Sequence, residues 1–289
     1  MIRTAAANPV RIGLEGFTFP DLDAFALVDL AAGARYAFAG VRLVDPATNT
    51  PTLPADQAHR LREHAIRRGI TLFGADLVDL EGPRDGWADV FAVLAAAGVT
   101  RFSAIHRGAD LRAASRRFAE LVARAREYGL TPHLEPVSYF GIDSIGTVAD
   151  LVAHAGGGGL TLDTLHFGRR GDDLDRLAEL AAGTPVWLQV CDAPALDELV
   201  PAGATADERL AALRHESIAA RLAPGAGVCD VAAIVRTVRD AAPFRELVVM
   251  VEVPDHERVR RIGASAHAVA CRDAADALIA RVTVPEERP

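Results

Sequence analysis

The sequence predicts an α/β fold, a single (β/α)8 TIM barrel, from three observations. Short apolar runs alternate with stretches of helical apolar spacing, and this rhythm repeats along the whole chain of 289 residues. Several helical stretches end in a glycine just before the next run, as at Gly69, Gly98, Gly129 and Gly183, which is typical of a helix end followed by a short loop. The turn GLEGFTFP after the first run lacks the glycine-rich phosphate pattern of the rival fold, an open doubly wound sheet. We expect one domain over residues 1–289.

The apolar runs predict eight buried parallel strands, because they lack the polar alternation of a half-exposed sheet. They span residues 11–17, 36–45, 69–78, 100–107, 130–137, 160–167, 184–192 and 246–254. The clearest helices are expected over residues 54–69, 87–98, 110–129 and 173–183. The longest connection, from Asp192 to Val228, follows the seventh strand and contains a further helix-like piece. Long connections at the carboxyl ends of strands are where barrel enzymes place their sites.

The composition excludes several kinds of chemistry. All 31 basic residues are arginine, so a Schiff-base lysine, a pyridoxal-phosphate lysine and a Walker lysine are impossible. The formal charge of −8 argues against a nucleic-acid partner, since phosphates require a basic face. The three cysteines have no metal or redox spacing, and the chain shows neither a secretory signal nor a run of 18 apolar residues. We therefore expect a cytoplasmic protein without a membrane partner.

Four of the predicted strands each end in one oxygen-bearing side chain: Glu135, Asp163, Gln189 and Glu252. A polar group buried at a strand end without a partner costs about 1–3 kcal/mol or more. Because the four strands are consecutive, their ends are expected to meet at the mouth of the barrel. Three carboxylates and one amide oxygen favour Mn²⁺ or Mg²⁺ over Zn²⁺, which prefers sulfur and nitrogen. The sequence thus predicts a divalent metal site at this mouth.

Five strings carry a resemblance to a known family: LEPVSYFGIDS, DTLHFGRRG, LQVCDAP, RLAPGAGVCD and VEVP. They resemble the xylose-isomerase-like TIM barrels, the sugar phosphate isomerase/epimerase group. The resemblance covers about residues 100–255 well, and the first three strands only by their rhythm. It implies the same four metal ligands, with Co²⁺ as a further possible ion. One departure is Ala226, which stands where most members have a glutamate in the sequence P-G-E-G.

The resemblance also implies roles for individual residues. Glu135 and Glu252 correspond to the catalytic acid/base pair, while His166 and Arg221 correspond to residues that bind substrate oxygens. His106, at the end of the fourth strand, is a further substrate-binding candidate by its position. The implied reaction is proton abstraction from the carbon α to a carbonyl, with the metal ion acting as a Lewis acid.

Weaker candidates lie on the first, second, fifth and seventh strands. Glu15 ends the first strand, and either contacts the substrate or supports the site by a hydrogen bond. Arg42, in the second strand, is either paired inside the barrel or binds an anionic group of the substrate. His133 and Trp187 are expected to be buried packing residues of the barrel interior.

The same site can serve several functions, and the sequence does not choose among them. The favoured one is a metal-dependent isomerase or epimerase acting on a small sugar-like or inosose-like carbonyl compound. The alternatives are a dehydratase (a lyase) of the 3-dehydroshikimate or inosose type and a non-catalytic sugar-binding barrel. An endonuclease-IV-like phosphodiesterase is disfavoured by the acidic charge and the scarcity of suitably placed histidines. A homo-oligomer, dimer or tetramer, is compatible with the family.

Overall fold

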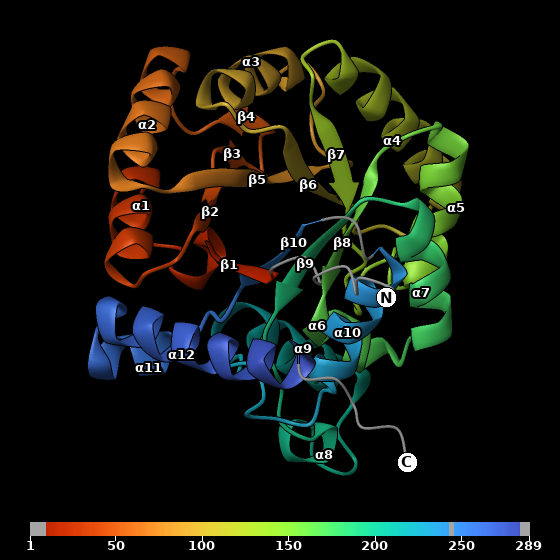
Figure 1. The fold of residues 1–289 in the computed structure, drawn as a ribbon. Helices are drawn as coiled ribbons and strands as arrows, with labels where there is room; N and C mark the ends of the chain where they lie inside the picture. The colour runs from red at the N-terminus through yellow and green to blue at the C-terminus, as the bar shows by residue number, and fades with distance from the viewer. Residues whose placement is uncertain (1–9, 243–245, 284–289) are drawn as a thin grey trace, which may run out of the picture.

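The structure is a computed structural model that describes residues 10–242 and 246–283. Within this part of the chain, eight parallel strands close into a barrel in the order β1-β10-β9-β8-β7-β6-β5-β2 (Figure 1). The predicted (β/α)8 barrel is therefore confirmed, and each predicted strand overlaps an observed one. The barrel strands are β1 Val10–Glu15, β2 Phe38–Arg42, β5 Thr71–Asp79, β6 Arg101–Ile105, β7 Thr131–Leu134, β8 Gly159–Asp163, β9 Val186–Val190 and β10 Leu247–Val251. That one domain extends over residues 1–289 stays a prediction, because both chain ends lie outside the described residues.

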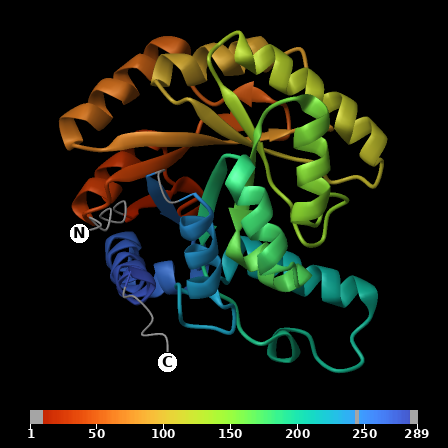
Figure 2. The ribbon, with the colours of Figure 1, turned by 45° about the vertical axis from the view of Figure 1, so that its right-hand side comes forward.

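Helices surround the barrel on its outside (Figures 1 and 2). Those that follow the strands in the expected rhythm are α1 Ala24–Gly33, α2 Ala55–Arg68, α3 Trp87–Ala97, α4 Leu111–Arg126, α5 Ile145–Ala155, α7 Leu174–Gly183, α10 Val231–Ala241 and α12 Ala264–Thr283. Many begin at a side chain that accepts a hydrogen bond from the first turn, such as Asp23, Asp110 and Ser144. Within the described residues, none of the helices combines the length and the apolar character needed to cross a membrane.

Three of the four glycines predicted at helix ends have the left-handed conformation expected there. Gly69, Gly98 and Gly129 have φ values of 72°, 75° and 71°, a left-handed conformation that glycine adopts without steric cost. Gly183 instead belongs to the last turn of α7, and the chain leaves that helix through an extended Thr184. The helix therefore ends at Gly183 as expected, but without the left-handed conformation.

The connections after the strands hold elements that the sequence rhythm did not separate. A small antiparallel pair, β3 Val44–Asp45 and β4 Thr50–Pro51, follows β2. The strand predicted over residues 160–167 is wrong in its second half, because β8 ends at Asp163 and α6 Thr164–Arg170 begins there. The Asp163 carboxylate causes this change by accepting a hydrogen bond from the Leu165 N–H at 2.8 Å, as a helix N-cap does.

The longest connection is confirmed as the one between β9 and α10. It contains the short α8 Leu196–Leu199 and α9 Ala206–Ala219, and it extends away from the strands (Figure 2). The predicted helix-like piece corresponds to α9, whose start carries a reciprocal capping box between Thr205 and Glu208. A further helix, α11 His256–Ile262, follows β10.

The barrel interior has two layers of different character. The lower one, called here the inner cluster, consists of Phe38, Phe73, Trp187, Val248 and Met250, all buried. Phe73 meets both Phe38 and Trp187 edge to face, with ring centroids 5.6 Å apart. The predicted packing roles of Trp187 and His133 are confirmed, since both are buried and their rings lie 6.1 Å apart. The upper layer is polar and forms the site described next.

Candidate functional site

Polar side chains form a ring at the carboxyl end of the barrel. Each of the eight strands contributes one, from its middle, from its end or from the position just beyond: Glu15, Arg42, Asp76, Ser103, Glu135, Asp163, Gln189 and Glu252. We call these residues the mouth ring. Most are buried, with Arg42 and Glu135 partly exposed. Alternation along the strands explains the arrangement, because residues two apart share a face and the inner cluster lies directly below.

The four predicted metal ligands lie at the ends of four neighbouring strands, β7 to β10. The Arg221 guanidinium lies between two of them, with Nη1 2.6 Å from Asp163 Oδ2 and 2.8 Å from Glu252 Oε2. The Gln189 amide nitrogen donates to Glu252 Oε1 at 3.2 Å. Asp163, Glu252 and Gln189 are thus linked directly or through Arg221, which follows α9 in the long connection.

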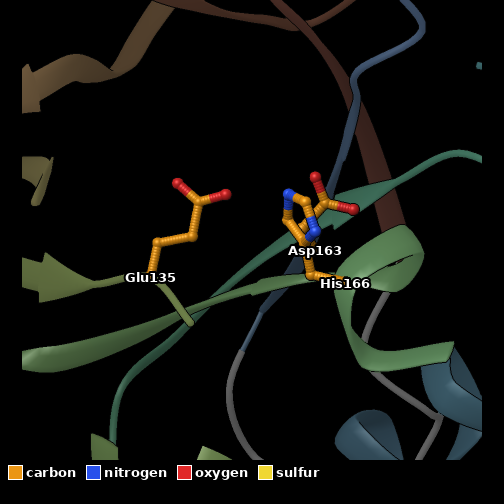
Figure 3. Close-up of side chains that lie close together, drawn as sticks. All are labelled: Glu135, Asp163 and His166. Carbon is orange, nitrogen blue, oxygen red and sulfur yellow. The ribbon is translucent and has the colours of Figure 1, made fainter. Parts of the chain in front are cut away.

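Glu135 completes a second grouping. One ligand atom each of Glu135, Asp163 and His166 lie within 4.8 Å of one another, and the three side chains project to the same side of the strands (Figure 3). His166 stands in the first turn of α6, where Ser138 Oγ lies 3.2 Å from its Nδ1 and Ser217 Oγ lies 3.4 Å from its Nε2. Burial lowers the pKa of His166 to about 4, so the imidazole is neutral at neutral pH.

Burial and mutual repulsion control the protonation of the acids. Burial raises the pKa of Glu135 well above its ordinary value, and the charge of Glu252 adds to this rise. The pKa of Glu252 is raised to about 8, again mainly by burial, although Arg221 opposes the shift. Burial also opposes ionisation of Asp163, but the Arg221 guanidinium, together with the hydrogen bond from the Leu165 N–H, outweighs it and holds the pKa of this carboxyl below its ordinary value.

The donor atoms fit a divalent cation. Gln189 Oε1 is buried and has no hydrogen-bond partner, and among the described residues no donor is assigned to the Glu135 carboxylate. If all three carboxyl groups lose their protons when a metal ion binds, they and the one guanidinium leave two negative charges, which an ion of charge +2 would balance. All the available atoms at Glu135, Asp163, Gln189 and Glu252 are oxygens, the donors that Mg²⁺ and Mn²⁺ favour.

A cavity of about 200 Å³ opens at this mouth. This volume is below the range of about 300–1,000 Å³ that is typical of sites for drug-sized ligands, so the cavity suits a small molecule. Its wall combines the acids with arginines and aromatic rings: Phe17, Arg42, Asp76, Arg107, Glu135, Tyr139, Phe140, His166, Gln189, Ser217, Arg221 and Glu252. Glu135, Gln189, Glu252, His166 and Arg221 therefore share one cavity, and Asp163 contacts it through Arg221.

The structure does not bring His106 into this cavity. His106 is buried directly after β6, and neither ring nitrogen has a hydrogen-bond partner. Its two neighbours in sequence, Ile105 and Arg107, line the cavity, whereas His106 does not. Contact of His106 with a substrate stays a prediction that this geometry does not support.

Asp76 is a site residue that the sequence reading missed. It is buried, lines the cavity and accepts a hydrogen bond from Ser103 Oγ at 3.0 Å. Burial raises its pKa to about 6. Glu15, one of the weaker candidates, accepts a hydrogen bond from Trp187 Nε1 at 2.6 Å, and its second oxygen has no partner. The signal for Asp76 was its place near the end of a predicted strand, the same signal that singled out the other acids.

Buried polar contacts fix the long connection that carries Arg221. Asp192 accepts hydrogen bonds from the N–H groups of Gly225 and Cys229, at 3.0 and 2.9 Å. Backbone groups thus anchor this loop, and Ala226, at the position where the resemblance expects a glutamate, is exposed. The buried ion pair of Arg169 with Glu216 joins α6 to α9, and so holds the helices that bear His166 and Ser217 together.

Comparisons with known proteins agree with this fold. None of the curated protein sequences matches the chain. Among solved structures, a zinc-bound IolI protein superposes with a TM-score of 0.73 at 16% identity, covering 95% of this chain and 100% of its own. A xylose isomerase domain protein from Alicyclobacillus acidocaldarius gives 0.70 at 16% identity, with 96% and 100% covered. The D-psicose 3-epimerase of Clostridium cellulolyticum H10 gives 0.66 at 14% identity, with 93% and 99% covered. At these identities the likeness concerns the fold.

The family assignment comes from the sequence itself. The family described as xylose isomerase-like TIM barrel matches residues 30–275, most of the chain. This range contains β2 and all later barrel strands, and therefore all four predicted metal ligands together with His166 and Arg221. The chain belongs to the xylose isomerase-like TIM barrel family.

Proposed function

We propose that this protein is a divalent-metal-dependent isomerase or epimerase that acts on a small polyhydroxylated carbonyl compound. The observation that carries the proposal is the pair of carboxyl groups Glu135 and Glu252, which face one small cavity and whose pKa values are both raised. A raised pKa makes a carboxylate a stronger base, so that the group can both accept and return a proton in one catalytic cycle.

Glu135, Asp163, Gln189 and Glu252 would hold the cation through oxygen atoms. When bound, a divalent ion supplies Lewis-acid polarisation of a carbonyl group. Mn²⁺ and Mg²⁺ fit this donor set best, and Co²⁺ is the next candidate. Arg221 remains close to Asp163 and Glu252 and limits the repulsion between them.

The chain's own residues supply the proton transfer. One of Glu135 and Glu252 removes the proton from the carbon next to the carbonyl group, and the other donates a proton to the product. The two acids titrate as a coupled pair, so their roles depend on which one holds the proton when substrate binds. Return of the proton to the neighbouring carbon gives isomerisation. Return to the same carbon, on its opposite face, gives epimerisation.

Two further residues would orient the substrate. His166 is neutral and can donate or accept a hydrogen bond to a hydroxyl group, with Ser138 and Ser217 fixing its ring. Arg221 has a buried guanidinium close to the acids, and it can donate to a substrate oxygen on which negative charge develops. The aromatic rings of Tyr139 and Phe140 cover one side of the cavity and help to exclude water.

Deuterium exchange tests the proposal. The protein loaded with Mn²⁺ is incubated in D₂O with a panel of ketoses, inososes, hydroxypyruvate and 3-dehydroshikimate, and carbon-bound deuterium is followed by NMR. We expect label at the carbon α to the carbonyl of at least one compound. Dehydration of dehydroshikimate or an inosose would shift the assignment to a lyase, and no labelling or turnover with any compound would contradict the proposal.

A further inference from the structure

We infer that the substrate of this site carries an anionic group, a carboxylate or a phosphate, that binds Arg42 and Arg107 on the side of the mouth opposite Glu135, Asp163 and Glu252. The inference rests on the proposed function, because it assumes that the reacting end of the substrate lies at Glu135 and Glu252. It adds the chemical class of the substrate's other end.

The barrel order separates the cavity wall into two arcs. The acids Glu135, Asp163 and Glu252 belong to β7, β8 and β10, which form one continuous arc with β9. Arg42 ends β2 and Arg107 follows β6, and both lie on the arc formed by β1, β2, β5 and β6. Both arginines line the cavity. A ligand that spans the mouth from the acids would place its far end beside these two cations.

Arg42 carries a charge that no carboxylate neutralises by direct contact within the described residues. Its Nη1 donates to a neutral group, the Pro20 carbonyl oxygen, at 2.9 Å. Its guanidinium carbon lies 5.6 Å from the centre of the Phe17 ring, an arrangement that orients the group. Asp76 is close enough to be influenced by this charge, but it forms its hydrogen bond with Ser103. Among residues 10–242 and 246–283, the Pro20 carbonyl is the one acceptor assigned to the Arg42 side chain, which leaves further N–H donors for a ligand.

Among the described residues, the Arg107 guanidinium pairs with a carboxylate through its Nε edge. Its Nε lies 2.7 Å from Asp79 Oδ2, and its guanidinium stands 5.0 Å from the centre of the Phe140 ring. The side chain remains 50% exposed, so the two terminal nitrogens can still donate. Arg221, by contrast, forms ion pairs with two carboxylates, those of Asp163 and Glu252.

These two cations have the chemistry that recognises a carboxylate or a phosphate. A guanidinium group presents several N–H donors in a plane and binds either anion through paired, charge-assisted hydrogen bonds. Glu135, Asp163 and Glu252 on the other arc repel an anion, which favours its binding at the arginines. The mouth-ring acids on the same arc as the arginines are Asp76 and Glu15, which accept hydrogen bonds from Ser103 and Trp187. The cavity of about 200 Å³ limits the substrate to a few carbons between its reacting carbonyl and its anionic end.

Isothermal titration calorimetry with matched ligands tests the inference. The protein loaded with Mn²⁺ is titrated with D-fructose, D-fructuronate and D-fructose 6-phosphate, which share a ketose head and differ at the far carbon. We expect at least one anion to bind about 10- to 100-fold more tightly than fructose, the worth of charge-assisted hydrogen bonds. The two anions separate a carboxylate site from a phosphate site.

Variants identify the residue responsible. Arg42→Gln should remove most of the preference for the anion over fructose. Arg42→Lys should keep part of it, which guards against a folding defect in the first variant. The matched control is Arg67→Gln, which removes a positive charge from an exposed position of α2 and should keep the full preference.

Three results would overturn the inference: equal affinity for the three ligands, a preference that survives both Arg42→Gln and Arg107→Gln, or no binding of any of them at millimolar concentration. The outcome is independent of turnover. An anion preference without deuterium exchange would support the anion site and contradict the proposed function. Deuterium exchange with a neutral ketose, without any preference for an anion, would support the proposed function and contradict the anion site.

Discussion

The inner cluster and the mouth ring occupy the same barrel, one above the other, yet they differ in every physical respect. The inner cluster buries large apolar side chains that meet edge to face. The mouth ring buries acids that repel one another and leaves single oxygens of Glu15 and Gln189 without a partner. The first arrangement stabilises the fold, whereas the second costs stability and is typical of a functional site.

Trp187 joins the two layers. Its ring packs within the inner cluster, and its Nε1 donates to Glu15 of the mouth ring. This difference predicts that substitutions in the inner cluster will reduce the stability of the fold. Conservative substitutions in the mouth ring will instead reduce activity. The predictions that follow test this division, beginning with the largest expected effect.

Replacing the acids of the proposed proton-transfer pair should have the largest effect. Glu135→Gln and Glu252→Gln keep the size of the side chain but remove the base, so each should slow deuterium labelling by about 10²- to 10⁴-fold. The fold should remain, as judged by circular dichroism. Glu179→Gln, at an exposed position of α7, is the control and should label at the parent rate.

Two results would contradict the roles of Glu135 and Glu252 in proton transfer. Labelling that persists in both variants would place the base elsewhere, with His166 the next candidate and His106 after it. Turnover without any label in the product would indicate a hydride shift between carbons, and the proton-transfer roles of Glu135 and Glu252 would be wrong.

The inner cluster should show the opposite response. Trp187→Ala removes a fully buried ring and should lower the free energy of unfolding by about 3–5 kcal/mol, measured by urea denaturation. Trp187→Phe keeps most of the packing but removes the hydrogen bond to Glu15, and should cost about 1–3 kcal/mol. Divalent metal content at saturation should stay the same in the folded protein. A stability loss below 1 kcal/mol in Trp187→Ala would contradict the stabilising role of the cluster.

The pH dependence of stability should reveal the cost of the mouth ring. An unfolded glutamate titrates near 4.5, whereas the pKa of Glu252 in the folded protein is raised to about 8. Between these values the folded protein keeps a proton that the unfolded chain loses, so the contribution of Glu252 to stability falls as pH rises through this window. Excess Mn²⁺ should offset the loss, because it binds the folded state.

The measurement is the urea midpoint of the metal-free protein from pH 5 to pH 8, compared with that of Glu252→Gln. The variant lacks the titrating group, so its stability should fall less steeply with rising pH. Parallel curves for the parent and the variant would show that the pKa of Glu252 is not raised in the folded protein.

Gln189→His should have the smallest effect. The substitution replaces a neutral oxygen donor with a nitrogen donor, so the metal site should persist and its preference should move toward Co²⁺ or Zn²⁺. Competition between Mn²⁺ and Co²⁺, followed by elemental analysis, measures this change. An ion preference identical to that of the parent would mean that Gln189 does not contact the metal.

Local sequence patterns predicted the strands and the strand-end acids because both depend on neighbouring residues. Alternation along β7 and β9 placed Glu135 and Gln189 above His133 and Trp187, as the structure has them. Asp76 also lies near the end of its predicted strand, but β5 continues beyond it to Asp79, and the pairing of β5 with β6 shifts register between Ala75 and Val78. Such an irregularity changes which residues face inward, and the sequence pattern does not show where it falls.

Local sequence patterns also did not predict the contacts made by individual side chains with other segments. The strand predicted to continue through Leu165 to Phe167 became a helix because the Asp163 side chain caps it. The position of Arg221 between Asp163 and Glu252 joins residues 58 and 31 positions apart. The resemblance to the family gave Arg221 a role toward substrate oxygens, and the structure adds its contact with both acids.

Metal binding by Asp163→Ala tests the central claim most directly. The account places a divalent ion at Glu135, Asp163, Gln189 and Glu252, so loss of one carboxylate should sharply weaken binding. Parent, Asp163→Ala and Asp197→Ala, a control at an exposed position of α8, are stripped with EDTA, saturated with Mn²⁺, gel-filtered and assayed by elemental analysis. The account predicts about one ion per chain in the parent and the control, and far less in Asp163→Ala although that variant is folded. Equal metal content in all three proteins would contradict it.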